Sequence, residues 1–224
     1  MGVVAEKLLK LKEQIAKKAL DCGRDPNMIT LVAVTKLADV SAIKEAYDAG
    51  QRDFGENYVQ KVLPKMAALP SDIRWHFIGA VQKNKINKIL GKFVLVHSVD
   101  SQKIADAMNI RAERFGLVQD ILIEVNTSGE ETKRGIPPEK VYELAMHINE
   151  NCPNLKLLGL MTMAPYTDDR TVIERCFKGL RNLRDELAKY GIELPHLSMG
   201  MTNDWEIAIE HGATILRIGT AIFG

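Results

Sequence analysis

Eight short apolar segments alternate with helix-like segments along the chain, and this alternation constrains the fold more than any other feature. Several of the apolar segments, such as residues 29–35, are aliphatic or β-branched almost throughout, which is typical of parallel strands buried on both faces. Strands that alternate with helices indicate an α/β fold with a parallel sheet. We expect the strands at residues 29–35, 52–56, 75–79, 93–98, 120–126, 155–161, 196–200 and 214–219.

Eight is also the number of strands that closes a (β/α)8 barrel of the TIM type, a fold that typically needs about 250 residues. The chain has 224 residues, so we expect its loops to be short. The competing architecture is an open doubly wound sheet, but the Gly-x-Gly-x-x-Gly motif typical of it does not follow the first strand. No linker, repeat or break in composition divides the sequence. We therefore predict a single barrel domain over residues 1–224.

Residues 1–22 precede the first strand and form an extra element. Leu8, Leu11 and Ile15 recur at helical spacing, which predicts an amphipathic helix. A basic amphipathic helix is also suited to a membrane surface, but these apolar side chains are modest and acidic residues such as Glu13 interrupt the positive charge. We expect this helix to pack on the barrel.

Composition excludes several classes of protein. Hydrophobic residues make up 46% and charged residues 26% of the chain, which excludes a disordered or low-complexity protein. The 30 basic and 29 acidic residues leave a net charge of +1, so there is no bulk field for nucleic acid or an anionic membrane. No apolar run approaches the roughly 20 residues of a membrane span. The three cysteines form no Cys-x-x-Cys pair, and His76, His97 and His196 lack metal-ligand spacing. We expect a cytoplasmic protein without a metal site.

The last two strands end in loops suited to an anion. Barrel enzymes frequently bind phosphate with the loops after strands 7 and 8. Here Ser198 and Gly200 end the seventh strand, and Gly219 and Thr220 follow the eighth. Glycine lets backbone N–H groups approach phosphate oxygens, and the hydroxyl groups add hydrogen bonds. A helix that starts near residues 202–204 would direct its positive end at the same anion. The alternative is that the glycines only form tight turns.

Two charged residues also stand at strand ends. Lys36 directly follows the buried first strand, where burial would lower the pKa of its amine and make it a nucleophile. The alternative is a lysine that simply reaches water. Arg217 interrupts an apolar strand and needs a ligand or an acidic partner, for instance Glu124 or Glu56. A lysine and a phosphate site at one barrel mouth are what pyridoxal 5′-phosphate (PLP) requires.

Six segments together resemble the PLP homeostasis protein family. They are TKL at 35–37, GENYVQ at 55–60, HFIGAVQKNK at 76–85, GLMTMAP at 159–165, LSMGMTND at 197–204 and RIGTAIFG at 217–224. The resemblance extends from the first strand to the last residue. It implies a fold similar to the barrel domain of alanine racemase, without the second, β-rich domain of that enzyme. Ala80, Val81, Thr202 and Trp205 depart from the commonest form of the pattern.

The resemblance also implies roles for individual residues. Lys36 would form a Schiff base with PLP, and Arg217 would face the pyridine nitrogen. Ser198, Gly200, Gly219 and Thr220 would hold the phosphate, and Asn57 would line the same pocket. Because arginine stays charged and only donates hydrogen bonds, the ring nitrogen would stay unprotonated and the cofactor would stabilise carbanions poorly.

These implications favour a PLP-binding protein that limits free cofactor and supplies it to apo-enzymes, without robust catalysis of its own. The chain ends five residues past Gly219, so we expect no racemase-type second domain and no obligate dimer. One alternative is a small amino-acid racemase that uses Tyr58 or Tyr166 as its second base. Another is a barrel enzyme in which Lys36 reacts with a phosphorylated metabolite. Lys133 could offer a second amine to PLP, but we expect it and Lys83–Lys88 to be solvated.

Overall fold

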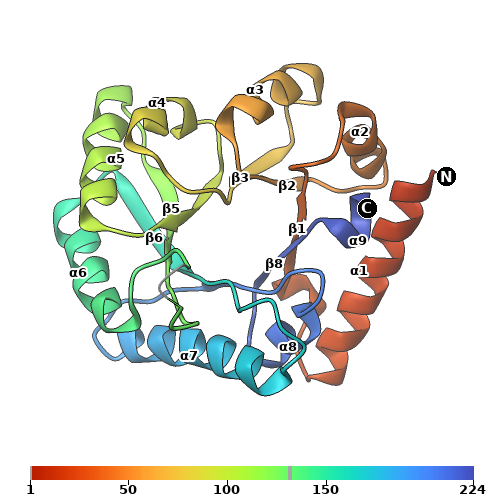
Figure 1. Cartoon of the computed structure of the whole chain (residues 1–224). Coiled ribbons are helices and arrows are strands. Elements are labelled where there is room, and N and C mark those ends of the chain that lie inside the picture. Colours follow the sequence, from red (N-terminus) through yellow and green to blue (C-terminus); the bar gives the residue numbers. More distant parts are fainter. Residues whose placement is uncertain (1, 131–132) are drawn as a thin grey trace.

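The computed structural model describes residues 2–130 and 133–224, and its eight parallel strands close into a barrel in chain order (Figure 1). The ring closes where β1 pairs with β8, with Thr30 opposite Ile215 and Val32 opposite Arg217. This confirms the predicted fold class. The strands are β1 (Thr30–Val34), β2 (Asp53–Glu56), β3 (Arg74–Phe77), β4 (Leu95–Val99), β5 (Gln119–Glu124), β6 (Leu155–Met161), β7 (His196–Ser198) and β8 (Ile215–Ile218).

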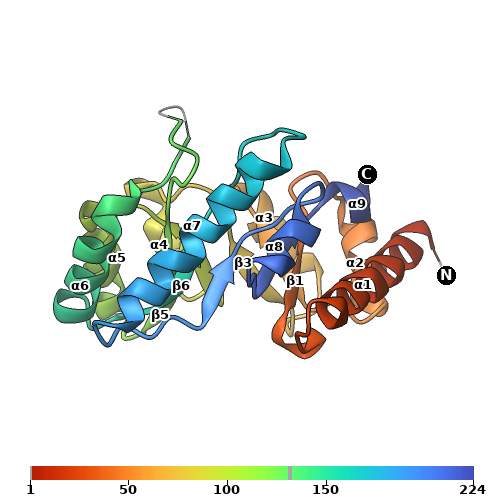
Figure 2. The ribbon, with the colours of Figure 1, turned by 90° about the horizontal axis from the view of Figure 1, so that it is seen from below.

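Each predicted strand overlaps an observed one, but several end two residues earlier than expected. Residues 78–79, 125–126 and 199–200 leave the regular ladder, because the chain turns there into the loops at the carboxyl ends of the strands. The loops after β5 and β6 project from the same side of the barrel (Figure 2). Lys36, Asn57 and Gly219 therefore lie just beyond strand ends, whereas Ser198 and Arg217 lie within β7 and β8.

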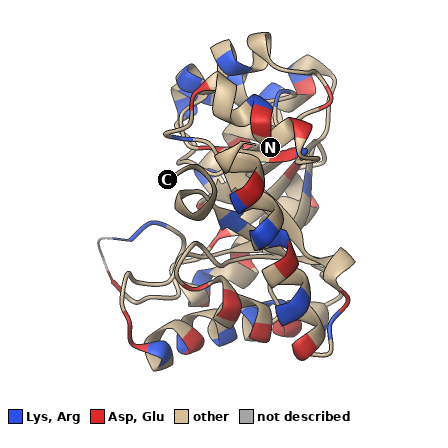
Figure 3. Cartoon of the chain, turned by 90° about the vertical axis from the view of Figure 1, so that its right-hand side faces the viewer, with Lys and Arg blue, Asp and Glu red and all other residues tan. Residues whose placement is uncertain are grey.

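Helices surround the sheet and cover its outer face. They are α1 (Val3–Asp21), α2 (Val40–Asp48), α3 (Val59–Ala68), α4 (Ile86–Ile89), α5 (Gln102–Phe115), α6 (Val141–Asn151), α7 (Arg170–Ala188), α8 (Trp205–Glu210) and α9 (Thr220–Phe223). Short 3-10 turns lie at Pro26–Met28, Lys83–Lys85 and Pro138–Lys140. Acidic and basic residues are interspersed along the helices seen in Figure 3. None of the helices in the described ranges has an apolar stretch long enough to cross a bilayer.

The extra N-terminal helix α1 packs against the first and last helices of the barrel. Leu8, Leu11 and Ile15 are buried, as their spacing predicts, and the helix lies against α2, α8 and α9. Lys18 forms an ion pair with Glu210 of α8 at 2.5 Å. These contacts confirm a helix packed on the barrel, and they bring the two chain termini together at one edge of the molecule (Figure 1).

The core has two parts. A large apolar cluster fills the space between the sheet and the helices, and a small one of Val32, Leu95, Leu122, Met161 and Ile215 lies inside the barrel. Barrel interiors are usually filled with branched apolar side chains. Here polar and charged side chains from five strands share that interior with the small cluster. They extend from the interior toward the carboxyl ends of the strands.

Candidate functional site

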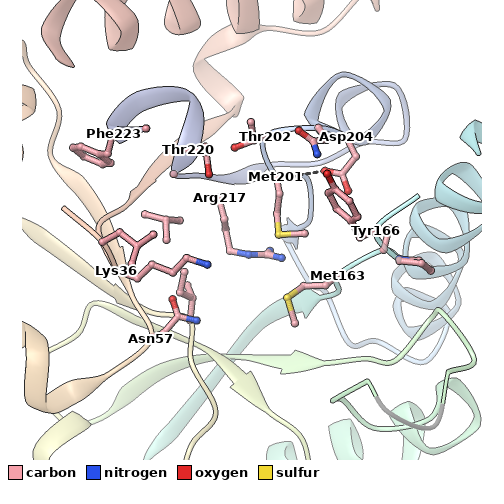
Figure 4. Close-up of a pocket in the computed structure, with 18 of the residues that line it drawn as sticks. Lys36, Asn57, Met163, Tyr166, Met201, Thr202, Asp204, Arg217, Thr220 and Phe223 are labelled. Carbon is pink, nitrogen blue, oxygen red and sulfur yellow. Dashed lines mark hydrogen bonds between the residues drawn. The ribbon is translucent and has the colours of Figure 1, made fainter. Parts of the chain in front are cut away.

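A cavity of about 470 Å³ opens at the carboxyl ends of the strands (Figure 4). Its walls come from segments far apart in the chain, namely the ends of β1, β2, β6, β7 and β8. Among the residues predicted to be functional, those that line it are Lys36, Asn57, Arg217, Gly219 and Thr220. Because parallel strands bring their carboxyl ends to one edge, the closed barrel gathers these residues in one place.

Lys36 is held at the cavity by the peptide that precedes it. The hydroxyl of Thr35 donates to Glu56 Oε1 at 2.8 Å, and Lys65 Nζ donates to the Thr35 carbonyl at 2.7 Å. Lys65 Nζ also lies 2.5 Å from Glu56 Oε1, so this ion pair holds both the hydroxyl and the carbonyl of Thr35. Lys36 itself is exposed, and the burial on which its predicted activation rested is absent. Figure 4 shows its amine directed into the cavity, toward Asn57 and Arg217.

Asn57 follows β2 and offers an unused acceptor. Its Oδ1 is buried, and no group in the described part of the chain donates to it. The backbone of Asn57 is fixed by a close approach to Gly79, because a Cβ on Gly79 would lie 2.0 Å from the Asn57 carbonyl oxygen. A buried polar atom without a partner is costly unless a ligand or water satisfies it. Asn57 therefore points to a ligand with a polar group at this position.

Arg217 enters the cavity from inside the barrel. Its Nη1 donates to Ser198 Oγ at 2.6 Å and its Nη2 to the Thr162 carbonyl at 2.8 Å. The ion pair with Glu124 or Glu56, which was the alternative to a ligand, does not form, because no carboxylate of the described residues lies within 4 Å of the guanidinium and Glu56 is paired with Lys65. Burial lowers the pKa of Arg217 to about 10 against the attraction of Asp204 and Glu124. The side chain thus stays charged at neutral pH.

The two predicted anion loops contribute to the cavity unequally. Gly219 and Thr220 line it, and a side chain at Gly219 would press on β1, since its Cβ would lie 3.1 Å from the Val34 carbonyl oxygen. Ser198 and Gly200 are buried and do not line the cavity. Gly200 adopts φ +98° and its carbonyl accepts from Arg217 N at 2.9 Å. Direct phosphate contacts by Ser198 and Gly200 stay a prediction.

The loop after β7 reaches the cavity a few residues later than expected. Met201, Thr202 and Asp204 line it, and Asp204 Oδ1 accepts from Met201 N at 2.5 Å. Thr202, which we placed near a helix start and noted as a departure from the family pattern, therefore brings a hydroxyl to the site (Figure 4). The hydroxyl residues on either side of Gly200, Ser198 and Thr202, were a signal for this, but sequence alone does not tell which hydroxyl faces inward. Helix α8 begins at Trp205, close to the predicted start.

The remaining lysines and tyrosines considered in the sequence analysis lie partly at the cavity and partly outside it. Lys133 lines the cavity, although we favoured a solvated position for it, whereas the neighbouring Arg134 is exposed. Tyr166 also lines the cavity and is 92% exposed, while Tyr58 is exposed outside it. Lys83 and Lys88 are exposed, as expected, whereas Lys85 between them is half-buried. Sequence reasoning missed the Glu56–Lys65 pair, because nothing in the spacing of the two residues shows that both face the Thr35 peptide.

Comparison with known proteins supports one family. The model of the alanine racemase N-terminal domain matches residues 25–224. A pyridoxal phosphate homeostasis protein from Aquifex aeolicus is 47% identical over 98% of this chain and 96% of its own. A structure of an unknown protein from Bifidobacterium adolescentis superimposes with a TM-score of 0.93, at 37% identity over 98% of this chain and 94% of that one.

A third relative was solved with the cofactor. PipY of Synechococcus elongatus PCC7942, with PLP bound, has a TM-score of 0.87 and 33% identity over 99% of this chain and 100% of its own. The chain belongs to the pyridoxal phosphate homeostasis protein family. The sequence resemblance is thereby confirmed.

The cavity residues of this family member fit the cofactor of that name. The cavity is within the roughly 300–1,000 Å³ typical of small-ligand sites. PLP carries an aldehyde, a phosphate, a phenolic oxygen and a ring nitrogen. Lys36 offers an amine for the aldehyde, Thr202 and Thr220 offer hydroxyls for the phosphate, and Arg217 offers N–H donors. The unpartnered Oδ1 of Asn57 adds an acceptor to this set of polar groups.

Proposed function

We propose that this protein binds PLP through Lys36 and acts in cofactor homeostasis, holding PLP and releasing it to apo-enzymes. The observation that carries the proposal is the Lys36 amine and the unpartnered Oδ1 of Asn57 in one cavity with Arg217, Thr202 and Thr220. The Lys36 amine would condense with the cofactor aldehyde, forming a C=N bond and releasing one water. When bound, PLP supplies an electron-accepting ring.

The residues of the chain divide this task. Gly219, Thr220 and the loop of Thr202 would hold the phosphate, with Ser198 and Gly200 supporting them. Asn57 would contact the ring substituents. Arg217 would donate a hydrogen bond to the ring nitrogen. Because Arg217 stays charged at neutral pH, it cannot accept a hydrogen bond, so the ring nitrogen would act as the acceptor and stay unprotonated. A ring held in this state is a weak electron sink, which supports a role in binding rather than turnover.

Reductive trapping tests the covalent contact. Borohydride added to PLP-loaded protein would leave a pyridoxyl group on the peptide that contains Lys36, and mass spectrometry would locate it. Lys36→Ala should lose the label and weaken binding at least tenfold, or about 1.4 kcal/mol. Lys83→Ala is the matched control, since Lys83 is an exposed lysine outside the cavity. Retention of the label by Lys36→Ala would overturn the assignment.

The rim of the cavity supports release to a partner. Leu37 and Tyr166 line the mouth and are 88% and 92% exposed, and exposed apolar side chains of this kind mark interaction sites. We place PLP-dependent apo-enzymes at this rim, and we place the protein as a monomer in the cytoplasm. Its three cysteines, all unpaired, suit a reducing compartment. Light scattering should give the mass of one chain.

Transfer kinetics test the rim. The Leu37→Ser/Tyr166→Ser double variant should transfer PLP to a purified apo-aminotransferase several-fold more slowly. Its release of PLP to a small carbonyl scavenger should change less, because the scavenger needs no contact with the rim. Val118→Ser, an exposed apolar residue outside the cavity, is the control. Equal slowing of both reactions would show that the rim governs release alone.

A further inference from the structure

A continuous line of hydrogen bonds crosses the interior of the barrel and ends at Arg217. Asp53 Oδ1 lies 3.1 Å from His76 Nε2, and His76 Nδ1 lies 3.0 Å from His97 Nε2. His97 Nδ1 lies 2.9 Å from Ser198 Oγ, which in turn accepts from Arg217 Nη1 at 2.6 Å. The five residues come from β2, β3, β4, β7 and β8, and none is more than 9% exposed. The contact between His97 and Ser198 joins opposite sides of the barrel.

The two ends of the line determine which atom donates at each step. Arg217 only donates, so Ser198 Oγ is its acceptor. Asp53 is ionised, because hydrogen bonds from His76 and Arg74 lower its pKa although burial acts to raise it. Asp53 therefore accepts, and His76 Nε2 carries a proton. A neutral His76 then accepts at Nδ1 from His97 Nε2, and His97 accepts at Nδ1 from the Ser198 hydroxyl.

The opposite direction does not satisfy every group. If His76 were a cation, both of its nitrogens would donate, and His97 would have to donate from Nδ1 to Ser198. Ser198 would then receive two donors, and its own proton would have no acceptor among the described residues. Burial also lowers the pKa of His97 well below its ordinary value, and the charge of Arg217 lowers it further. Neutral histidines with the proton on Nε2 are the arrangement that pairs all five side chains.

We propose that His97 is a positioning residue for the cofactor site, which acts through Ser198 to aim the guanidinium of Arg217. His97 Nδ1 holds the Ser198 proton away from Arg217, so that the Ser198 oxygen stays available as an acceptor. The Thr162 carbonyl fixes the second nitrogen of the guanidinium. Two fixed points orient this planar group, and its remaining N–H donors face the cavity. This inference rests on the proposed function, because Arg217 needs a ligand to aim at.

Filling the barrel interior with this line of polar and charged side chains costs free energy. Burying charged and polar groups is often no more stable than filling the same space with apolar side chains, and its best-supported benefit is a specified geometry. The small apolar cluster shows that the same interior accommodates aliphatic side chains. A line of hydrogen bonds that only stabilised the fold would not need to end at a residue of the cavity.

Histidine tautomers test the inference without any cofactor. Nitrogen NMR of the cofactor-free protein at neutral pH should show His97 and His76 neutral, with the proton on Nε2 in both. A proton on Nδ1 of His97, or a cationic His76, would overturn the proposal. This result is independent of PLP binding, so it stands apart from the labelling of Lys36.

Two matched variants test the coupling to the cofactor. His97→Asn keeps an acceptor near the position of Nδ1, and His97→Gln keeps one near Nε2 instead. We expect His97→Gln and Ser198→Ala to weaken PLP binding about tenfold and to shift the absorption of bound PLP, while Lys36 is still labelled. His97→Asn should stay close to wild type, and His97→Gln/Ser198→Ala should lose no more than Ser198→Ala alone. Equal behaviour of the Asn and Gln variants, or additive losses, would overturn the proposal.

Discussion

Glu124, at the end of β5, shows how strongly the barrel interior acts on a single carboxyl group. Burial, reinforced by the charge of Asp100, raises its pKa from 4.5 to about 7, although Arg217 and Arg134 oppose the shift. The folded protein therefore holds a proton between about pH 4.5 and 7 that the unfolded chain has released. Stability from this group is present at the low end of that window and is lost as the pH rises through 7.

Glu124→Gln removes this dependence, because glutamine is neutral at every pH. The variant and wild type should be about equally stable near pH 4.5. Above pH 7 the variant should be more stable by on the order of 2–3 kcal/mol. Chemical denaturation at several pH values would measure the difference, with Glu113→Gln, an exposed site on α5, as the control. A difference that does not grow with pH would contradict the raised pKa.

At the scale of elements, the cavity depends on backbones that approach closely. Gly79 follows β3, and a Cβ there would lie 2.0 Å from the carbonyl oxygen and 2.7 Å from the Cα of Asn57. Backbone atoms cannot move aside as flexible side chains do. Gly79→Ala should therefore destabilise the protein by about 1–3 kcal/mol and displace Asn57 from the cavity, weakening PLP binding.

A second glycine gives the matched control for this substitution. Gly179 lies within α7, and nothing would lie within 4 Å of a Cβ added to it. Because glycine is a poor helix former, Gly179→Ala should stabilise the protein by about 0.5–1 kcal/mol and leave PLP binding unchanged. Thermal unfolding and PLP titration of both variants would check the pair. Similar effects at the two positions would show that close approach is not the cause.

The elements themselves were largely predictable from the chain, because buried parallel strands are nearly continuous apolar runs. The site was predictable where it follows from strand ends alone, as for Lys36, Gly219 and Thr220. It was not predictable where a loop decides which side chain faces inward, so that Thr202 lines the cavity while Ser198 does not.

Contacts across the barrel were out of reach for a different reason. Arg217 is paired through Ser198 and His97 rather than with a carboxylate, and His97 and Ser198 are 101 residues apart. Nothing in their spacing shows that β4 and β7 face one another. The number of strands predicted a closed barrel, but the rotation of each strand around it decides which inward side chains meet.

At the scale of the whole molecule, the closed sheet predicts that the chain unfolds as one unit. A ring in which β1 pairs with β8 has no free edge at which one half can separate. Helix α1 also joins the two ends of the sequence, because it packs against both α2 and α8. Contacts shared around a closed ring favour one cooperative unfolding step. The residues 1–224 should therefore behave as a single domain.

The two tryptophans report on opposite parts of this ring. Trp75 lies in β3 and Trp205 in α8, which follows β7, and both are buried. Trp75→Phe and Trp205→Phe each leave one fluorescent reporter. In each variant the fluorescence transition in urea should coincide with the loss of helical circular dichroism, even if the substitution shifts both midpoints. Midpoints that separate in either variant would show that part of the barrel unfolds on its own, because a reporter can depart from the global signal only if its surroundings melt first.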